Sequence, residues 1–99
     1  MTKIAFDVNN TLIKTKDENV MSFSYSPRYE IIQMLITLSK LPDTEIYVWS
    51  SGGMWYANEF VRELGLEEYV DYIVEKNFQG IDICFDDRMV NLAKVNIKV

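Results

Sequence analysis

The sequence lacks histidine altogether and holds a single cysteine, Cys84, in 99 residues. Histidine is the side chain that most readily titrates near neutral pH and a frequent zinc ligand, so its absence excludes histidine-based acid–base catalysis and most zinc sites. One cysteine cannot form a disulfide within the chain, which fits a reducing compartment. We expect Cys84 to be a small core residue rather than a reactive thiol.

Long apolar segments and an excess of basic residues are also missing. No apolar run approaches the roughly 20 residues that span a membrane. The first 15 residues are interrupted by Lys3, Asp7 and Lys14, unlike a secretory signal. We therefore expect a soluble, cytoplasmic chain with no membrane partner. Ten basic residues stand against 15 acidic ones, a net charge of -5, and this balance does not indicate nucleic-acid binding, because the phosphate backbone attracts Lys and Arg.

Strand-like and helix-like segments alternate along the chain, which predicts an α/β fold in a single domain over residues 1–99. The apolar runs predict five strands, over residues 3–7, 45–49, 71–75, 81–85 and 94–99. Two helices are expected, one opening at Pro27 and one over residues 54–64, with a short helical turn over residues 88–92. The polar segment 8–25 predicts a loop, with room for a short hairpin.

The start of the first helix is predicted from its capping pattern. Ser26 is the expected N-cap and Pro27 the first helical residue. Glu30 then lies in the first turn, where the helix dipole favours an anion. The residues expected to share one buried face are Ile31, Leu35 and Leu38.

Polar side chains follow three of the predicted strands. Asp7 ends the first strand, Ser50 and Ser51 follow the second, and Asp86 and Asp87 follow the fourth. Ligands bind outside the carboxyl ends of the strands in open parallel sheets. One such residue could be placed there by chance, but three groups in a chain this short predict a common site.

The segment from Asp7 to Leu12, Asp-Val-Asn-Asn-Thr-Leu, follows an apolar strand. Taken alone, Asp7 could equally cap a turn through Asn9 or Asn10. The segment resembles the first motif of the haloacid dehalogenase-like phosphohydrolases, Asp-x-Asp-x-Thr-Leu. The resemblance implies that Asp7 is a nucleophile that forms an aspartyl phosphate, and that Asp7 and the backbone carbonyl of Asn9 bind Mg²⁺.

Position 9 departs from the family pattern, which has a second Asp there as the catalytic acid and base. An Asn side chain has no titratable proton near neutral pH, and general acid–base catalysis typically supplies about 10²–10⁴-fold. We therefore expect a slow phosphomonoester hydrolase. The alternative is a catalytically weak or inactive domain that binds a phosphorylated ligand or a protein partner.

The remaining family motifs are matched in order. Ser50 is the expected phosphoryl-binding hydroxyl, with Ser51 as the alternative, and Ser51 and Gly52 belong to a turn whose amides could also bind phosphate. Lys76 matches the lysine that neutralises phosphoryl charge, with Lys94 as a distant second. A surface Lys or an N-capping Ser would be the ordinary explanation of these residues taken singly.

The fourth motif is an apolar strand that ends in the adjacent carboxylates of Asp86 and Asp87. Paired carboxylates repel each other unless a cation lies nearby. Mg²⁺ binds few protein carboxylates together with phosphate and water oxygens. The expected ligands are therefore Asp7, the Asn9 carbonyl and Asp86, with Asp87 also available. The alternative is a solvent-facing acidic turn paired with Arg88.

The resemblance also implies the architecture, a three-layer Rossmann-like fold with a parallel sheet of about five strands. Its first strand would lie between the second and the fourth. The gaps between motifs leave no room for a cap domain, which implies a macromolecular phosphorylated substrate or a neighbouring surface as lid. A receiver-type phosphoacceptor domain fits less well, because it needs its acidic pair after the first strand. The aromatic residues beside Ser50 are expected to be packing residues, or else to line the pocket: Trp49, Trp55 and Tyr56.

Overall fold

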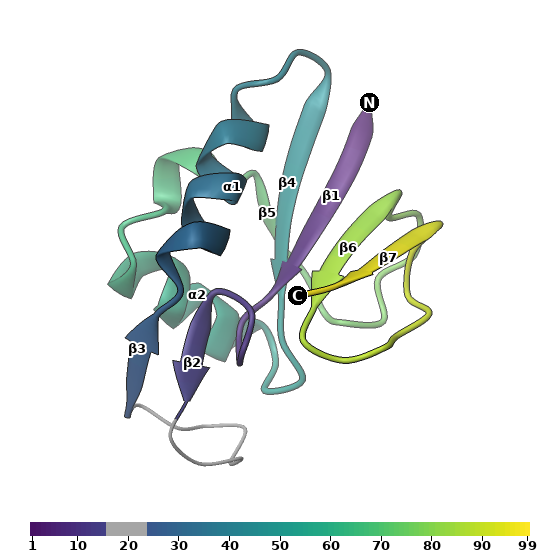
Figure 1. Cartoon of the computed structure of the whole chain (residues 1–99). Helices are drawn as coiled ribbons and strands as arrows, with labels where there is room; N and C mark the ends of the chain where they lie inside the picture. The colour runs from purple at the N-terminus through teal and green to yellow at the C-terminus, as the bar shows by residue number, and fades with distance from the viewer. Residues whose placement is uncertain (16–23) are drawn as a thin grey trace.

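Five parallel strands form the central sheet of the computed structural model, which describes residues 1–15 and 24–99. Their order is β5-β4-β1-β6-β7 (Figure 1). The strands are β1 (Thr2–Asp7), β4 (Thr44–Trp49), β5 (Tyr72–Ile73), β6 (Ile83–Asp86) and β7 (Val95–Lys98). The predicted α/β class and parallel sheet are confirmed, and the first strand lies between the second and fourth predicted ones, as expected.

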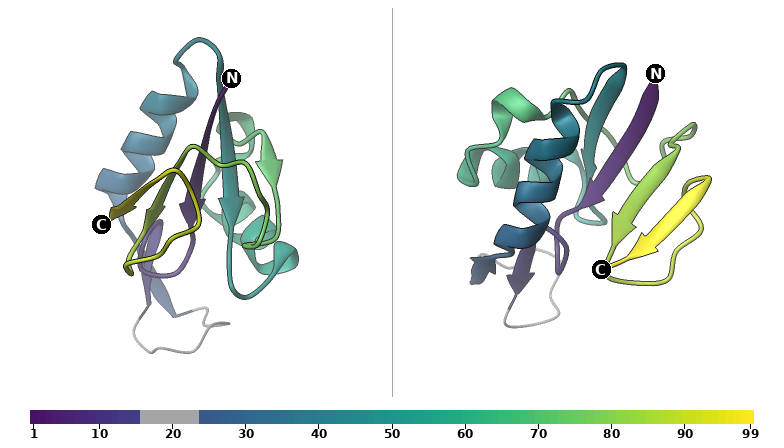
Figure 2. Two further views of the ribbon diagram at one scale, coloured as in Figure 1. Left: turned by 90° about the vertical axis from the view of Figure 1, so that its right-hand side faces the viewer. Right: turned by 45° about the horizontal axis from the view of Figure 1, so that its top comes forward.

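Both helices, α1 (Tyr29–Ser39) and α2 (Met54–Glu63), pack on one face of the sheet (Figures 1 and 2). The chain steps from β1 to β4 and then to β5 in one direction, and right-handed crossovers place both connections on the same side. Alternate residues of β1 and β4 point toward the helices, where they meet Leu35 of α1 and Phe60 of α2 in the main core. These sheet residues are Ile4, Phe6, Ile46 and Val48.

The opposite face of the sheet is covered by connecting segments. After β5 the chain returns past β1 to β6 and continues to β7, so right-handed connections now lie on the other side. Ile81 is buried there against Ala5, Tyr47 and Cys84, and Leu92 packs beside them. The third layer of the predicted architecture is therefore made of loops, and Cys84 is a core residue, as expected.

The predicted helical turn over residues 88–92 is wrong, because these residues form bends and irregular backbone. The side chain of Asn96 explains part of the difference. Its Oδ1 accepts hydrogen bonds from the backbone N–H groups of Leu92 and Ala93, at 2.8 and 3.0 Å. A side-chain acceptor of this kind competes with helical backbone bonding.

The predicted start of the first helix is also wrong. Ser26 and Pro27 belong to β3 (Tyr25–Pro27), which pairs in antiparallel register with β2 (Ile13–Thr15). The helix begins at Tyr29, with Arg28 in the N-cap position and no side-chain capping bond. The β2–β3 pair is a short hairpin of the kind for which residues 8–25 left room, but its second strand extends beyond that segment to Pro27. Residues 16–23 of the segment lie outside the described part of the chain.

Other expectations for the helices hold. Glu30 lies in the first turn of α1, and Ile31 and Leu35 are buried while Leu38 packs at the edge of the core. Gly65 follows α2 with φ 68°, the left-handed conformation in which glycine is the least strained residue. No helix in the described residues is both long enough and apolar enough to span a membrane.

Candidate functional site

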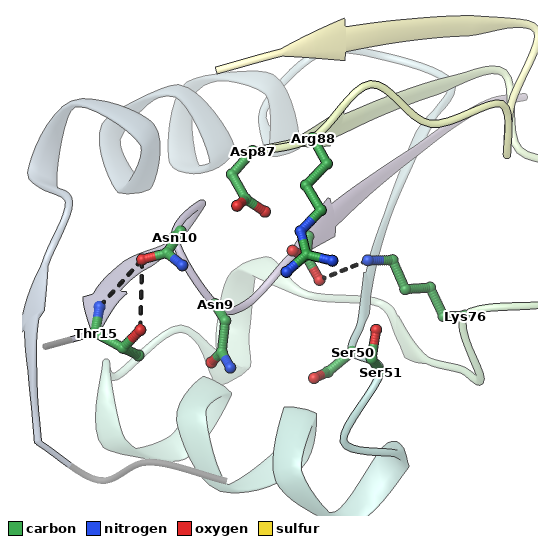
Figure 3. A pocket seen from close by; sticks show the side chains of 9 residues that line it. Asn9, Asn10, Thr15, Ser50, Ser51, Lys76, Asp87 and Arg88 are labelled. Atoms are coloured by element: carbon green, nitrogen blue, oxygen red, sulfur yellow. Dashed lines mark hydrogen bonds and ion pairs between the residues drawn. The ribbon is translucent and has the colours of Figure 1, made fainter. Parts of the chain in front are cut away.

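From β1 the chain adds strands first on one side of the sheet, β4 and β5, and then on the other side, β6 and β7. The predicted polar residues gather at the carboxyl end of β1, where this direction changes. Such a reversal opens a crevice, because the chain leaves the neighbouring strands on opposite faces. Asp7 is the last residue of β1 and Asp86 the last of β6, while Ser50 directly follows β4. The cavity at this edge has a volume of about 260 Å³ (Figure 3) and is lined by Asp7, Asn9, Asn10, Thr15, Ser50, Ser51, Lys76, Asp87 and Arg88.

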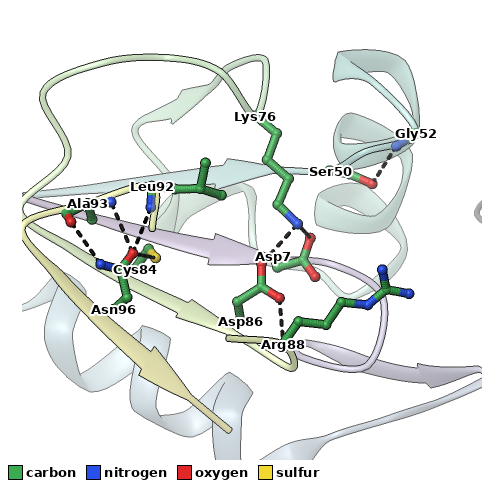
Figure 4. Close-up of polar contacts among 10 residues, drawn as sticks. All are labelled: Asp7, Ser50, Gly52, Lys76, Cys84, Asp86, Arg88, Leu92, Ala93 and Asn96. Carbon is green, nitrogen blue, oxygen red and sulfur yellow. Dashed lines mark hydrogen bonds and ion pairs between the residues drawn. The ribbon is translucent and has the colours of Figure 1, made fainter. Parts of the chain in front are cut away.

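Lys76 joins the carboxylates of the two central strands. Its Nζ lies 3.2 Å from Asp7 Oδ1 and 2.9 Å from Asp86 Oδ2 (Figure 4). Asp86 also accepts a hydrogen bond from the backbone N–H of Arg88 at 3.0 Å. Lys94, the second candidate for this role, pairs instead with Asp82, which precedes β6 at the opposite end of the strand. Of the two candidate lysines, the structure therefore places Lys76, and not Lys94, beside Asp7 and Asp86.

Burial and mutual charge interactions shift the pKa values of the carboxylates and the lysine at this site. Asp7 is 5% exposed and Asp86 is 1% exposed. Burial raises the pKa of Asp7 to about 7, although the Lys76 charge opposes the shift. Burial alone would lower the pKa of Lys76, but Asp7 and Asp86 together outweigh it and raise that pKa. Burial and the Asp86 charge raise the pKa of Asp87. Perturbed groups of this kind concentrate at functional sites.

Three carboxylates of the site could hold a metal ion. One oxygen from each of Asp7, Asp86 and Asp87 lies within 4.8 Å of the other two. Oxygens on opposite sides of a magnesium ion are separated by about 4.2 Å, twice the usual bond length of about 2.1 Å. Carboxylate oxygens are donors of the kind that a hard cation such as Mg²⁺ takes.

A tight turn after β1 positions the Asn residues. The Val8 carbonyl accepts hydrogen bonds from three successive N–H groups, those of Thr11, Leu12 and Ile13, at 3.0 to 3.2 Å. Asn10 has φ 60°, a left-handed conformation that Asn tolerates better than most residues. The turn brings Asn9 back to the cavity beside Asp7.

Asn9 is held from the side of α2. The buried Tyr56 hydroxyl donates a 2.7 Å hydrogen bond to Asn9 Oδ1. The Asn9 amide oxygen therefore accepts a hydrogen bond from a buried neighbour, and the amide has no titratable proton near neutral pH. This side chain can orient an oxygen atom but cannot carry a proton to or from it.

The two serines differ in burial. Ser50 is 3% exposed, whereas Ser51 is exposed, and both line the cavity. Ser50 Oγ accepts a 3.0 Å hydrogen bond from the Gly52 N–H, so its own hydroxyl proton can still be donated. The Gly52 amide, one of the predicted phosphate donors, is directed at Ser50 in this arrangement. Ser50 is therefore the better-positioned hydroxyl.

Some residues of the cavity were absent from the predicted site. Asn10 and Thr15 come together because Asn10 Oδ1 accepts a 3.2 Å hydrogen bond from the Thr15 N–H. Arg88 was considered only as a partner of the acidic pair. Thr15 belongs to the hairpin, and no local sequence signal indicated that this hairpin reaches the cavity.

The aromatic residues near Ser50 do not line the cavity. Trp49 and Tyr56 are fully buried, and Trp55 is 59% exposed.

Replacing Lys76 by Met should lower the free energy of unfolding by roughly 2–3 kcal/mol at pH 8, because a buried ion pair that loses one partner leaves uncompensated charge. Added Mg²⁺ should restore part of the loss. Urea unfolding with and without Mg²⁺ measures both effects. The matched control is Lys94→Met, which removes the exposed pair with Asp82 and should cost much less. Equal losses in the two variants would show that Lys76 has no special role.

Comparisons of this chain with family models, with curated proteins and with solved structures found no match. A fold alone does not determine an activity. The assignment of function therefore depends on the residues of the cavity and their geometry.

Proposed function

We propose that this cavity binds Mg²⁺ and a phosphoryl group, and that the protein is a slow phosphomonoester hydrolase of the haloacid dehalogenase-like type. One observation carries the proposal. Lys76 joins the buried carboxylates of Asp7 and Asp86 at the carboxyl edge of the sheet, in a cavity that Ser50 also lines. A nucleophile, a neutralising cation and a hydroxyl donor are the groups that phosphoryl transfer requires.

Each residue has a distinct part in the proposed reaction. A carboxylate oxygen of Asp7 attacks phosphorus, and the bond from phosphorus to the ester oxygen breaks, which leaves an aspartyl phosphate. Ser50 donates a hydrogen bond to the transferring group, and Lys76 offsets its negative charge. Asp7, Asp86, Asp87 and the Asn9 carbonyl would hold Mg²⁺. When bound, the ion supplies positive charge beside the phosphoryl oxygens.

Asn9 limits the proposed reaction at two points. The leaving oxygen needs a proton as its bond to phosphorus breaks, and the water that later attacks the aspartyl phosphate must lose one. Asn9 can do neither, because its amide does not titrate. Substrates whose leaving groups are stable without a proton, such as aryl phosphates, should therefore react fastest.

A binding function is the second candidate, and the Tyr56–Asn9 hydrogen bond is the observation that favours it. This 2.7 Å contact holds a group that can donate to an oxygen but cannot act as acid or base. In this alternative the cavity retains a phosphorylated ligand without turning it over. Tight, Mg²⁺-dependent phosphate binding in calorimetry, together with no hydrolysis, would favour it.

The test of the hydrolase proposal is the release of phosphate from an aryl phosphate with and without Mg²⁺. Wild type should show slow hydrolysis that depends on Mg²⁺, and Asp7→Asn should show none. Asp82→Asn is the matched control, because it makes the same chemical change at the other end of the sheet, where Asp82 accepts a bond from the Lys3 N–H. Equal rates in wild type and Asp7→Asn would contradict the proposal.

The substrate is proposed to be a phosphorylated molecule that approaches an open site. Among the described residues between β1 and α1, only the β2–β3 hairpin adds to the core fold. An open cavity lets water reach the reacting groups unless the substrate or a partner excludes it. A macromolecular phosphoester would meet this requirement with its own surface.

A further inference from the structure

Arg88 contributes a second positive charge to the cavity, separate from Lys76. Lys76 is already engaged with Asp7 and Asp86. The Arg88 side chain is exposed and directed into the cavity (Figure 3). Its guanidinium makes no hydrogen bond or ion pair with any residue that the structure describes. The positive charge of Arg88 lowers the pKa of neighbouring Asp87. Burial of Asp87 has the larger, opposite effect, so that pKa is raised overall.

The cavity also continues beyond the proposed phosphoryl site. An adjoining cavity of about 460 Å³ shares Asn10 and Asp87 with it and is lined by two further cations, Lys14 and Arg28, and by Glu30, whose carboxylate pairs with Arg28 at 3.1 Å. Arg28 is held in place there, since its Nη1 donates a 2.8 Å hydrogen bond to the Asn10 carbonyl. A ligand larger than a phosphoryl group therefore has room on the side of the site that these cations line.

We propose that Arg88 determines specificity by binding a second anionic group of the substrate, a phosphate or carboxylate, while Lys76 and Ser50 bind the scissile phosphoryl group. This inference rests on the proposed hydrolase function. The planar guanidinium can donate two parallel hydrogen bonds to a phosphate or carboxylate, which a point charge cannot match. The substrate class is a phosphomonoester that carries a second anionic group.

The alternative is that Arg88 only balances the charge of Asp87. The two roles differ in substrate dependence. Charge balance would affect all substrates alike, whereas recognition of a second anion affects only those that carry one. Two matched pairs of substrates separate the roles: glycerol 3-phosphate with 3-phosphoglycerate, and fructose 6-phosphate with fructose 1,6-bisphosphate.

The experiment measures kcat/KM for these four compounds with Mg²⁺, in wild type and in an Asn9→Asp background, which restores a carboxyl group at position 9 and is expected to react faster. In at least one pair, the doubly anionic member should be preferred by roughly 10-fold or more, as expected for a hydrogen bond to a charged group. Arg88→Gln should remove most of that preference and lower the rate for the singly anionic member by at most about threefold. Arg88→Lys should keep only part of the preference.

Arg62→Gln is the control, because it removes the same charge from an exposed pair with Glu59 on α2 and should leave the preference intact. Hydrolysis of an aryl phosphate but of none of these four compounds would overturn this inference and leave the hydrolase proposal standing. Hydrolysis of the four compounds with no preference, or with a preference that survives Arg88→Gln, would do the same. No hydrolysis of these compounds or of an aryl phosphate in either background would overturn both.

Discussion

Replacing Asn9 by Asp is expected to increase the rate of phosphomonoester hydrolysis by roughly 10²–10⁴-fold, the usual contribution of a positioned general acid and base. The introduced carboxyl group would take the place of the Asn9 amide, which lines the cavity close to Asp7. The Tyr56 hydroxyl can donate to a carboxylate as it now donates to Asn9 Oδ1, so the side chain should keep its position. The gain should be largest for alkyl phosphates, whose leaving groups most need a proton.

Initial rates of phosphate release from an alkyl and an aryl phosphate measure this effect. Asn10→Asp is the matched control, because it adds the same charge to the next residue of the same turn. Asp tolerates the left-handed backbone of position 10 and keeps an acceptor for the Thr15 N–H. The control should bring no comparable gain. If the two variants had equal rates, the added charge rather than its position would be responsible.

Replacing Asp7 by Asn is expected to abolish hydrolysis and, at the same time, to stabilise the metal-free protein. The free energy of unfolding at pH 8 should rise by roughly 2–4 kcal/mol, since a folded pKa of about 7 against an ordinary 3.8 means that ionised Asp7 opposes folding. Groups that lower stability are common at functional sites, so this cost agrees with the proposed role of Asp7.

The pH dependence follows from the same shift. Because the pKa of Asp7 is raised in the folded state, wild type should lose stability relative to Asp7→Asn as the pH rises from about 4 to about 7 and then keep a constant difference. Mg²⁺ should stabilise wild type more at pH 8 than at pH 5, because bound metal favours the ionised carboxylate. Urea unfolding across this pH range, with and without Mg²⁺, measures both effects. A difference that shrinks as the pH rises would contradict the burial argument.

The central strands could be predicted because they are strongly apolar and end at polar residues, whereas their order was implied by the family resemblance. The predictions failed where tertiary contacts outweighed local signals. Ser-Pro is a helix-start pattern, yet Ser26 and Pro27 pair with β2 across the hairpin. Residues 88–92 lack a helix partly because Asn96, four residues further along the chain, accepts the backbone hydrogen bond of Leu92 with its side chain. The strand pairing depends on a partner strand, and the Asn96 contact depends on a side-chain direction, so neither follows from a capping or periodicity pattern.

In the candidate site, too, some residues could be predicted from the sequence and others only from the structure. Asp7, Ser50 and Asp86 were predictable because each falls at the end of an apolar strand, and parallel strands end at one edge. Lys76 was preferred to Lys94 through the family resemblance, but it lies in an irregular segment after β5, so only the structure shows it between Asp7 and Asp86. The roles of Tyr56 and Arg88 depend on side-chain directions, which a single sequence does not give.

The most direct test of the account is a crystal structure of the protein with Mg²⁺ and beryllium fluoride, a mimic of the phosphoryl group on a carboxylate. The account predicts beryllium fluoride attached to Asp7, in contact with Ser50 and Lys76. It also predicts Mg²⁺ bound by Asp7, the Asn9 carbonyl and Asp86, at distances of about 2.1 Å. An ordered structure obtained at saturating concentrations, with neither Mg²⁺ nor beryllium fluoride at Asp7, would contradict the central claim.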